Sequence, residues 1–265
     1  MHPNIEWYLL DTDRWFGIEC YAASGDHALC IVHGFRSWHR WGFIPLVARW
    51  FAERGIATYV LALPSSGYGP DGFAPTRFEH ATITDDRAAL GRAIELISDQ
   101  HTHLAGLGHS RGCLLLVLEH AAFERFVLWS PPAGFGRWSP RLRSQWRRDG
   151  TLPMGTHPEL GTPLQLGITY LDDLEQHHYN DELDCALQSC RAPTCIIVGA
   201  QDVVTPPSEV ERIVRRLPPL STQYHIIPAT GHTFGVVHPA TQITPALAEA
   251  LVRTSSFVDA WRTTS

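Results

Sequence analysis

A serine between two glycines is the first residue of this chain whose surroundings suggest catalysis. Ser110 is the centre of residues 108–112, Gly-His-Ser-Arg-Gly, which match the pattern G-x-S-x-G. An apolar run at 103–107 leads into the motif, and an apolar helical stretch at 113–122 follows it. A tight turn from strand to helix exposes the serine hydroxyl, and small flanking residues relieve the crowding. The motif predicts a nucleophilic serine, and an ordinary serine at the start of a helix is the alternative.

A serine hydroxyl needs a base to become a nucleophile, and the base needs an acid that holds its tautomer. His232 follows the apolar run 222–227, and Asp202 follows the run 194–198. The chain has fifteen histidines, so a single one is weak evidence, and an aspartate after a strand is often only a turn residue. The joint order of Ser110, Asp202 and His232, each after a different predicted strand, nevertheless predicts a catalytic triad.

Such a nucleophile also needs two N–H donors for the oxyanion of a tetrahedral intermediate. The residue after the nucleophile, Arg111, should supply one backbone N–H. The loop after the strand that ends at Val32 reads His33-Gly34-Phe35-Arg36, and the backbone N–H of Phe35 is the second candidate. The alternative is that His33-Gly34 only turns the chain, and a glycine there also allows close approach of a substrate.

Apolar runs and amphipathic stretches alternate along the chain, which is typical of an α/β protein. The runs predict strands at 28–32, 56–63, 103–107, 126–129, 194–198 and 222–227. Helical periodicity and end signals predict helices at 44–54, 82–97, 113–122, 208–217 and 245–262. Thr82 and Asp85 have the spacing of a capping box at the start of the second of these helices.

Residues 131–190 interrupt this alternation. They contain Gly, Pro, Trp, His and charges of both signs without sustained periodicity. A stretch of about 60 residues is too long for a plain loop in a compact domain. We therefore expect a core domain built from 1–130 and 191–265, with a cap inserted at 131–190.

The composition excludes several classes of function. The chain has 265 residues, a net charge of −6 with histidine neutral, and no lysine among its 21 basic residues. Without lysine it can form no pyridoxal-phosphate Schiff base and no Walker A loop. The acidic balance disfavours binding to nucleic acid or to an anionic membrane. No apolar stretch is long enough to span a membrane.

Compartment and metal content are inferred from the N-terminus and the cysteines. The N-terminal residues show neither a basic segment nor a long apolar segment, so we expect no secretory signal and a cytoplasmic protein. The six cysteines are sparse, and we interpret them as mostly buried reduced thiols rather than disulfides. No Cys/His spacing indicates a metal site, and no cofactor is expected.

At these positions the chain resembles the α/β-hydrolases of the serine-esterase kind. More narrowly, it resembles the bacterial dienelactone-hydrolase-like and feruloyl-esterase-like group with a short cap. The resemblance covers roughly residues 28 to 260 and includes His33-Gly34-Phe35, the turn at Ser110, Gly-x-x-Asp at 199–202 and Gly-His-Thr-Phe at 231–234. It implies that Ser110, Asp202 and His232 form the triad, in a mainly parallel sheet of about eight strands with helices on both faces. True dienelactone hydrolases use a cysteine nucleophile, so Ser110 counts against dienelactone as the substrate.

The cap offers candidates for substrate binding. It begins with five arginines at 137, 141, 143, 147 and 148 and ends with acidic residues from Asp172 to Asp184. The favoured interpretation is two solvated faces that pair with each other, and the alternative is that some arginines bind an anionic substrate end. Aromatic side chains could line an acyl or alcohol pocket, and Arg36 follows the oxyanion candidate where relatives often have smaller residues. The candidate substrate-binding residues are Arg36, Trp138, Trp146 and Tyr170.

The leading hypothesis is hydrolysis of a small carboxylic ester through an acyl-enzyme on Ser110. Thioester hydrolysis, acyl transfer or cleavage of small peptides could use the same triad. A non-catalytic binding module would be indicated by loss of a triad residue, and none is lost. The expected partner is a small ester or thioester substrate, without nucleic acid or membrane, and a homodimer is left open.

Overall fold

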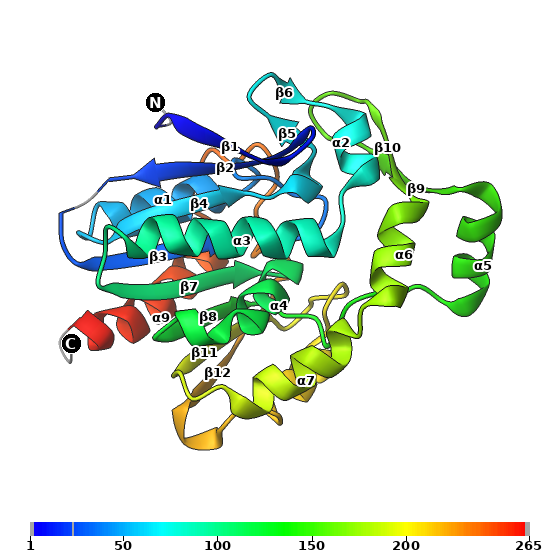
Figure 1. The fold of residues 1–265 in the computed structure, drawn as a ribbon. Helices are drawn as coiled ribbons and strands as arrows, with labels where there is room; N and C mark the ends of the chain where they lie inside the picture. The colour runs from blue at the N-terminus through cyan, green and yellow to red at the C-terminus, as the bar shows by residue number, and fades with distance from the viewer. Residues whose placement is uncertain (1–2, 23, 263–265) are drawn as a thin grey trace.

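Eight strands form the central sheet of the protein, in the spatial order β1-β2-β4-β3-β7-β8-β11-β12. The computed structural model describes residues 3–22 and 24–262. The strands are β1 (Ile5–Asp11), β2 (Arg14–Tyr21), β3 (His27–Val32), β4 (Ala57–Ala62), β7 (His103–His109), β8 (Arg125–Trp129), β11 (Thr194–Gly199) and β12 (Thr222–Ile227). All pairs from β4 to β12 are parallel, and only β1 and β2 run antiparallel to their neighbours (Figure 1). The predicted fold class, a mainly parallel sheet of about eight strands with helices on both faces, is confirmed.

Burial on both faces explains why these strands could be predicted from apolar runs. Strands β4 and β11 are buried at every position, and β3 at every position after His27. Continuous apolar runs are typical of parallel strands that helices cover on both sides. The hairpin β1–β2 was not predicted, because no position of β1 is buried and Glu6, Leu9 and Asp11 are exposed.

Helices cover both faces of the sheet, and alternate side chains of each strand point to one helix layer or the other. Leu29 and Ile31 pack in the cluster that includes α1 (Ile44–Ala52) and α9 (Pro245–Arg262). Cys30 and Val32 pack in the opposite cluster, with α3 (Ile83–Ser98), α4 (Arg111–Leu118) and α8 (Pro207–Val214).

Local signals set several of these boundaries. Helix α3 starts at the predicted capping box, in which the side chain of Thr82 accepts from the Asp85 N–H and Asp85 accepts from the Thr82 N–H. Between β4 and α3 the chain forms short elements. These are η1 (Pro64–Ser66), β5 (Tyr68–Gly69), β6 (Gly72–Phe73) and α2 (Pro75–His80). Two further single turns are η2 (His120–Ala122) and η3 (Pro219–Ser221).

The segment predicted as a cap contains five elements of its own. They are α5 (Pro140–Asp149), β9 (Thr151–Thr156), β10 (Pro163–Gly167), α6 (Ile168–Gln176) and α7 (Tyr179–Ser189). Helices α5 and α6 and the β9–β10 hairpin lie beyond the carboxyl edge of the sheet, whereas α7 returns along the body beside α4 (Figure 1). The sequence analysis did not resolve these elements individually, although the apolar Tyr179, Leu183, Ala186 and Leu187 of α7 recur at helical spacing and could have indicated that helix.

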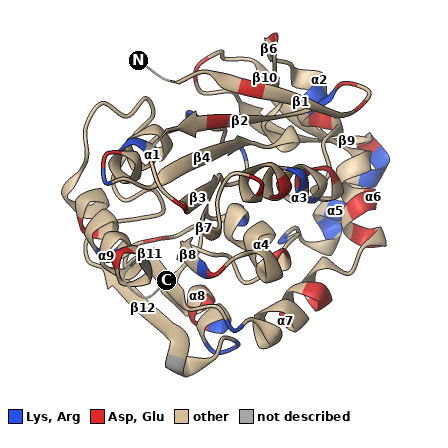
Figure 2. Ribbon diagram, turned by 60° about the vertical axis from the view of Figure 1, so that its left-hand side comes forward, with Lys and Arg blue, Asp and Glu red and all other residues tan. Residues whose placement is uncertain are grey.

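Charged residues of both signs are distributed over the helices and loops (Figure 2). Within residues 131–190, Arg147 of α5 pairs with Glu175 and, at 3.0 Å, with Asp172, both on α6. For Arg147, this pairing agrees with the interpretation of two charged faces that pair with each other, whereas Arg137 pairs with Glu209 outside the segment. All six cysteines are free thiols. Within the described ranges, no helix is both long enough and apolar enough to cross a membrane.

Candidate active site

Ser110 occupies a strained turn between β7 and α4. Its backbone has φ 53° and ψ −126°, a region that residues other than glycine rarely adopt. The turn brings backbones so close that the flanking glycines have no room for a side chain. A Cβ at Gly108 would lie 2.6 Å from the backbone N of Cys113, and one at Gly112 would lie 2.3 Å from the carbonyl oxygen of Val32. The glycines of the motif are therefore required by packing, and the serine stands where the sheet edge meets the helix N-terminus.

His232 and Asp202 meet across two neighbouring loops at the same edge. Their strands β12 and β11 run parallel, so the loops after them leave side by side. The Nδ1 atom of His232 lies 2.8 Å from Oδ2 of Asp202. A Cβ at Gly199 would lie 2.4 Å from the carbonyl oxygen of Thr230, so glycine is needed for the loops to pack this closely. The carboxylate accepts the Nδ1 proton, which leaves Nε2 of His232 as the basic nitrogen.

Asp202 is held as an anion by a set of donors around it. The side chain is fully buried, and its oxygens accept from the backbone N–H of Val204 and Thr205 and from the hydroxyl of Thr205. Burial alone would raise the pKa of Asp202, but the hydrogen bonds from His232 and Thr205 outweigh it and lower the pKa to about 2. Asp202 is therefore ionised across the physiological range. Thr205 was not among the predicted site residues, and its place three residues after Asp202 is the signal that could have indicated it.

A second histidine supports the loop of the first. His109 is buried, and its Nε2 lies 3.0 Å from the backbone carbonyl oxygen of His232. The carbonyl can only accept, so Nε2 of His109 carries the proton. Burial and the nearby His232 ring lower the pKa of His109 to about 3. His109 is thus a neutral side chain that ties the β7 end to the loop of His232.

The predicted oxyanion residues lie on either side of Ser110. A Cβ at Gly34 would be 3.0 Å from Cβ of Ser110, which places the loop after β3 against the serine. Phe35 follows this glycine, and no described residue accepts a hydrogen bond from its backbone N–H. Arg111 is the first residue of α4, where N–H groups have no partner within the helix. The Phe35 ring lies 4.8 Å from the guanidinium carbon of Arg111, so the two residues also contact each other.

A cavity of about 580 Å³ opens above the serine. Both Ser110 and His232 line it, together with aromatic and apolar side chains from the core and from residues 131–190. Of the predicted substrate-binding residues, Arg36, Trp138 and Tyr170 line the cavity. Trp146 is fully buried behind them, donates from Nε1 to the carbonyl oxygen of Leu166, and packs edge-on against Trp138. The cavity wall also includes residues that were not predicted: Trp41, Phe135, Met154, Thr156 and Leu164.

A buried ion pair lies beneath the cavity. The guanidinium of Arg111 contacts Oδ2 of Asp86 at 2.7 Å, and side-chain exposure is 8% and 0%. The same guanidinium donates to the hydroxyls of Ser65 and Tyr170. Asp86 also accepts from the backbone N–H and the hydroxyl of Ser65. The sequence analysis assigned only the backbone of Arg111, because no local pattern connects residues 65, 86, 111 and 170.

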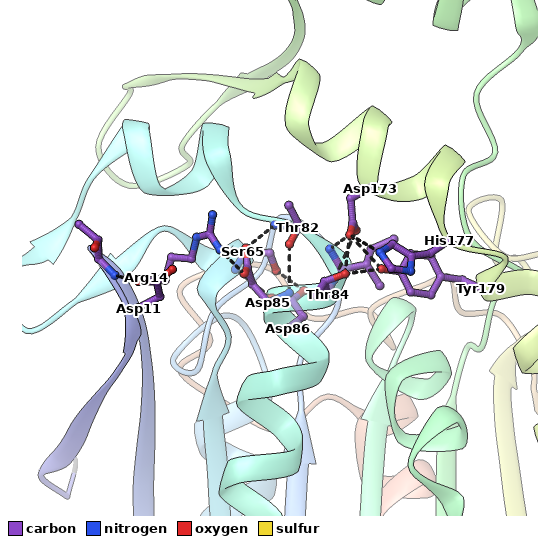
Figure 3. A network of polar contacts seen from close by, with 12 residues as sticks. Asp11, Arg14, Ser65, Thr82, Thr84, Asp85, Asp86, Asp173, His177 and Tyr179 are labelled. Carbon is purple, nitrogen blue, oxygen red and sulfur yellow. Dashed lines mark hydrogen bonds and ion pairs between the residues drawn. The ribbon is translucent and has the colours of Figure 1, made fainter.

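Asp86 lies in a wider polar network at the start of α3, and Figure 3 shows it near Ser65, Thr84 and Asp173. Asp173 of α6 accepts from the backbone N–H groups of Ile83 and Thr84 and from the hydroxyls of Thr84 and Tyr179. An acidic side chain at a helix N-terminus satisfies otherwise unpaired N–H groups and interacts favourably with the helix dipole. Through these contacts the carboxyl edge of the sheet is joined to α6 and α7.

Comparison with known proteins agrees with this architecture. The model of the "Alpha/beta hydrolase family" matches residues 31–244, and the chain therefore belongs to that family. No curated protein matches the chain. Similar solved structures include a soluble variant of monoglyceride lipase from Saccharomyces cerevisiae, with 12% identity, a TM-score of 0.76, and 98% of this chain and 96% of that chain covered. Another is Est1E from Butyrivibrio proteoclasticus with ferulic acid bound, with 16% identity, a TM-score of 0.67, and coverage of 96% and 98%. At these identities the similarity establishes the fold.

Proposed function

We propose that this protein is a serine hydrolase that cleaves a carboxylic ester of a small molecule through an acyl-enzyme on Ser110. The observation that carries the proposal is the contact between His232 and the buried carboxylate of Asp202, beside a serine held in a strained turn. Both the serine and the histidine face one cavity. Three groups with the roles of nucleophile, base and orienting acid thus converge at the carboxyl edge of the sheet.

In the acylation step, Nε2 of His232 takes the hydroxyl proton as Oγ of Ser110 attacks the ester carbonyl carbon. The carbonyl oxygen becomes an oxyanion, for which the backbone N–H groups of Phe35 and Arg111 are the proposed donors. Asp202 stabilises the imidazolium that forms. Collapse of the intermediate expels the alcohol, which takes its proton from His232.

In the deacylation step, a water molecule gives a proton to His232 and attacks the acyl carbon. The second intermediate collapses to the carboxylic acid and returns the proton to Ser110. None of these steps needs a metal ion or an organic cofactor. A thioester or a small peptide could react on the same three residues, so the leaving group is decided by a substrate panel.

The cavity walls favour a substrate with an aromatic or apolar body. Phe35, Trp138 and Tyr170 contact one another at ring distances of 5.8–6.3 Å along one side of the cavity. Pockets with such walls and a few convergent polar groups are typical of small-molecule sites. The ferulic acid bound to Est1E has such an aromatic body, which supports a feruloyl-esterase-like substrate for this site.

The test is covalent labelling with a fluorophosphonate probe, followed by intact mass measurement and peptide mapping. We expect one adduct per chain, on Ser110. The Ser110→Ala variant should give no adduct, and its turnover of 4-nitrophenyl acetate should fall by about 10⁴-fold or more. A matched control is Ser256→Ala, which removes an exposed hydroxyl on α9 and should label and turn over as the wild type does.

Labelling of another serine, or esterase activity that survives in Ser110→Ala, would refute the assignment. If the probe labels Ser110, methyl ferulate, a coenzyme A thioester and a dipeptide amide should then be compared by kcat/KM. A preference for the thioester or the amide over oxygen esters would overturn the ester assignment while leaving the nucleophile in place.

A further inference from the structure

The charges that line the cavity are all of one sign. Three arginines, Arg36, Arg111 and Arg137, contribute to its wall, and among the described residues no aspartate or glutamate does. This is unexpected on composition alone, because acidic residues outnumber basic ones and the net charge is −6. A concave site lined by one sign of charge attracts ligands of the opposite sign.

Two of the three charges are compensated behind the cavity wall. Arg111 pairs with the buried Asp86, and Arg137 pairs with Glu209 at 2.7 Å. Arg36 differs, because its side chain is exposed and has no hydrogen bond or ion pair with any residue in the described ranges. The uncompensated positive charge of the cavity is therefore that of Arg36.

The position of Arg36 places this charge at the entrance. Arg36 directly follows Phe35, the proposed oxyanion donor, and its Nη2 lies 3.3 Å from where a Cβ of Gly155 would be. Gly155 lies on β9 between two cavity-lining residues, Met154 and Thr156. The guanidinium thus bridges the space between the loop after β3 and the β9–β10 hairpin.

The backbone of Arg36 is a second, independent observation. Its φ is +59°, a left-handed conformation that glycine adopts without strain and that costs energy for a long side chain. Strained conformations of this kind are concentrated at functional sites, where the side chain has a role. Packing does not provide that role, because the side chain is exposed.

We propose that Arg36 binds an anionic group of the substrate, either a carboxylate or a phosphate, at the end distant from the ester bond. This inference rests on the proposed ester hydrolysis and names the substrate class of the same site. A guanidinium presents parallel N–H donors that fit the two oxygens of such a group. The substrate would then be an ester with an apolar or aromatic body and a charged end, such as a half-ester of a dicarboxylic acid or an ester of a hydroxyaryl acid or phosphate.

The experiment compares anionic esters with neutral ones of the same shape. Three anionic substrates separate the sources of charge: the mono-4-nitrophenyl ester of adipic acid, 4-acetoxybenzoate and 4-acetoxyphenyl phosphate. The primary amides of the first two and 4-acetoxyanisole serve as neutral partners. For at least one pair, wild-type kcat/KM for the anionic member should exceed that for the neutral member by about tenfold. That ratio should fall as salt is added, because the group is exposed.

Arg36→Gln should abolish the preference, so that the ratio of kcat/KM between the anionic and the neutral member of a pair falls to about one. Arg36→Lys should restore part of it, since the charge is kept but the paired donors are lost. A matched control is Arg141→Gln, which removes an exposed arginine on α5 that does not line the cavity. It should leave the ratio of kcat/KM between anionic and neutral esters unchanged.

The proposal is overturned if neutral esters react as well as every anionic partner, or if Arg36→Gln leaves the preference intact. Failure of the proposed function is a different result, because then neither member of a pair reacts and the fluorophosphonate probe gives no adduct on Ser110.

Discussion

Asp86→Asn is the substitution that tests most directly how Arg111 is held beneath the cavity. The carboxylate is fully buried and contacts the Arg111 guanidinium at 2.7 Å, while Ser65 donates two hydrogen bonds to it. The asparagine keeps one acceptor oxygen and has nearly the same volume. Its NH₂ group would face donors, and the guanidinium would lose its only anionic partner among the described residues.

The expected effect is a loss of about 3–5 kcal/mol in the free energy of unfolding, because removal of one member of a buried pair leaves an uncompensated charge. The total free energy of unfolding of a typical protein is only about 5–15 kcal/mol, so this loss would be a large fraction of it. The adjacent Asp85→Asn is a matched control, since Asp85 caps α3 and pairs with Arg14, which is 48% exposed. Its cost should be about 1 kcal/mol.

The assay is equilibrium urea unfolding followed by tryptophan fluorescence. It compares three single variants, Asp86→Asn, Asp85→Asn and Arg111→Met, with the double variant that combines Asp86→Asn and Arg111→Met. The double variant has no buried charge at this position. Its loss of unfolding free energy should therefore be smaller than the summed losses of Asp86→Asn and Arg111→Met by at least about 2 kcal/mol. The Asp86→Asn variant should also lose kcat on 4-nitrophenyl acetate, because a shift of the Arg111 side chain would disturb the backbone of the same residue, whose N–H is the proposed oxyanion donor. The reasoning is refuted if Asp86→Asn costs less than about 1 kcal/mol or if the two substitutions are additive.

Two further predictions concern the turn at the serine. Gly112→Ala would place a Cβ 2.3 Å from the carbonyl oxygen of Val32, a backbone atom with little freedom to move. We therefore expect the free energy of unfolding, measured in urea, to fall by more than about 3 kcal/mol. A stability near that of the wild type would contradict the packing argument. His109 has a pKa of about 3 when folded, against an ordinary value near 6.5, so the unfolded chain binds its proton first as pH falls and stability declines between pH 6.5 and pH 3. His109→Gln should reduce the slope of unfolding free energy against pH by about 1.4 kcal/mol per pH unit between pH 4 and pH 6, and an unchanged slope would show that His109 is charged in the folded protein.

The elements that position the site were predicted where apolar runs are continuous. The strands predicted at 28–32, 194–198 and 222–227 have observed bounds within about one residue of the prediction. The first two of these strands are buried on both faces and are therefore almost entirely apolar, whereas the third is a half-exposed edge strand that ends in the apolar pair Ile226-Ile227. The hairpin β1–β2 and the five elements of residues 131–190 were not predicted. Strand β1 has no buried position, α5 buries only Trp146, and β9 and β10 are short and half-exposed.

The sequence alone indicated which residues could react. Ser110, Asp202 and His232 each follow an apolar run, and parallel strands bring their carboxyl ends to one edge, so their convergence follows from chain order. Only the tertiary structure decided that Asp86, rather than the neighbouring Asp85, faces Arg111, and that Tyr170 lines the cavity while Trp146 lies behind it. It also decided which arginine of the cavity has no acidic partner among the residues that the structure describes. Such choices depend on the rotation of a helix by about 100° per residue and on contacts between residues far apart in the chain, which no local pattern records.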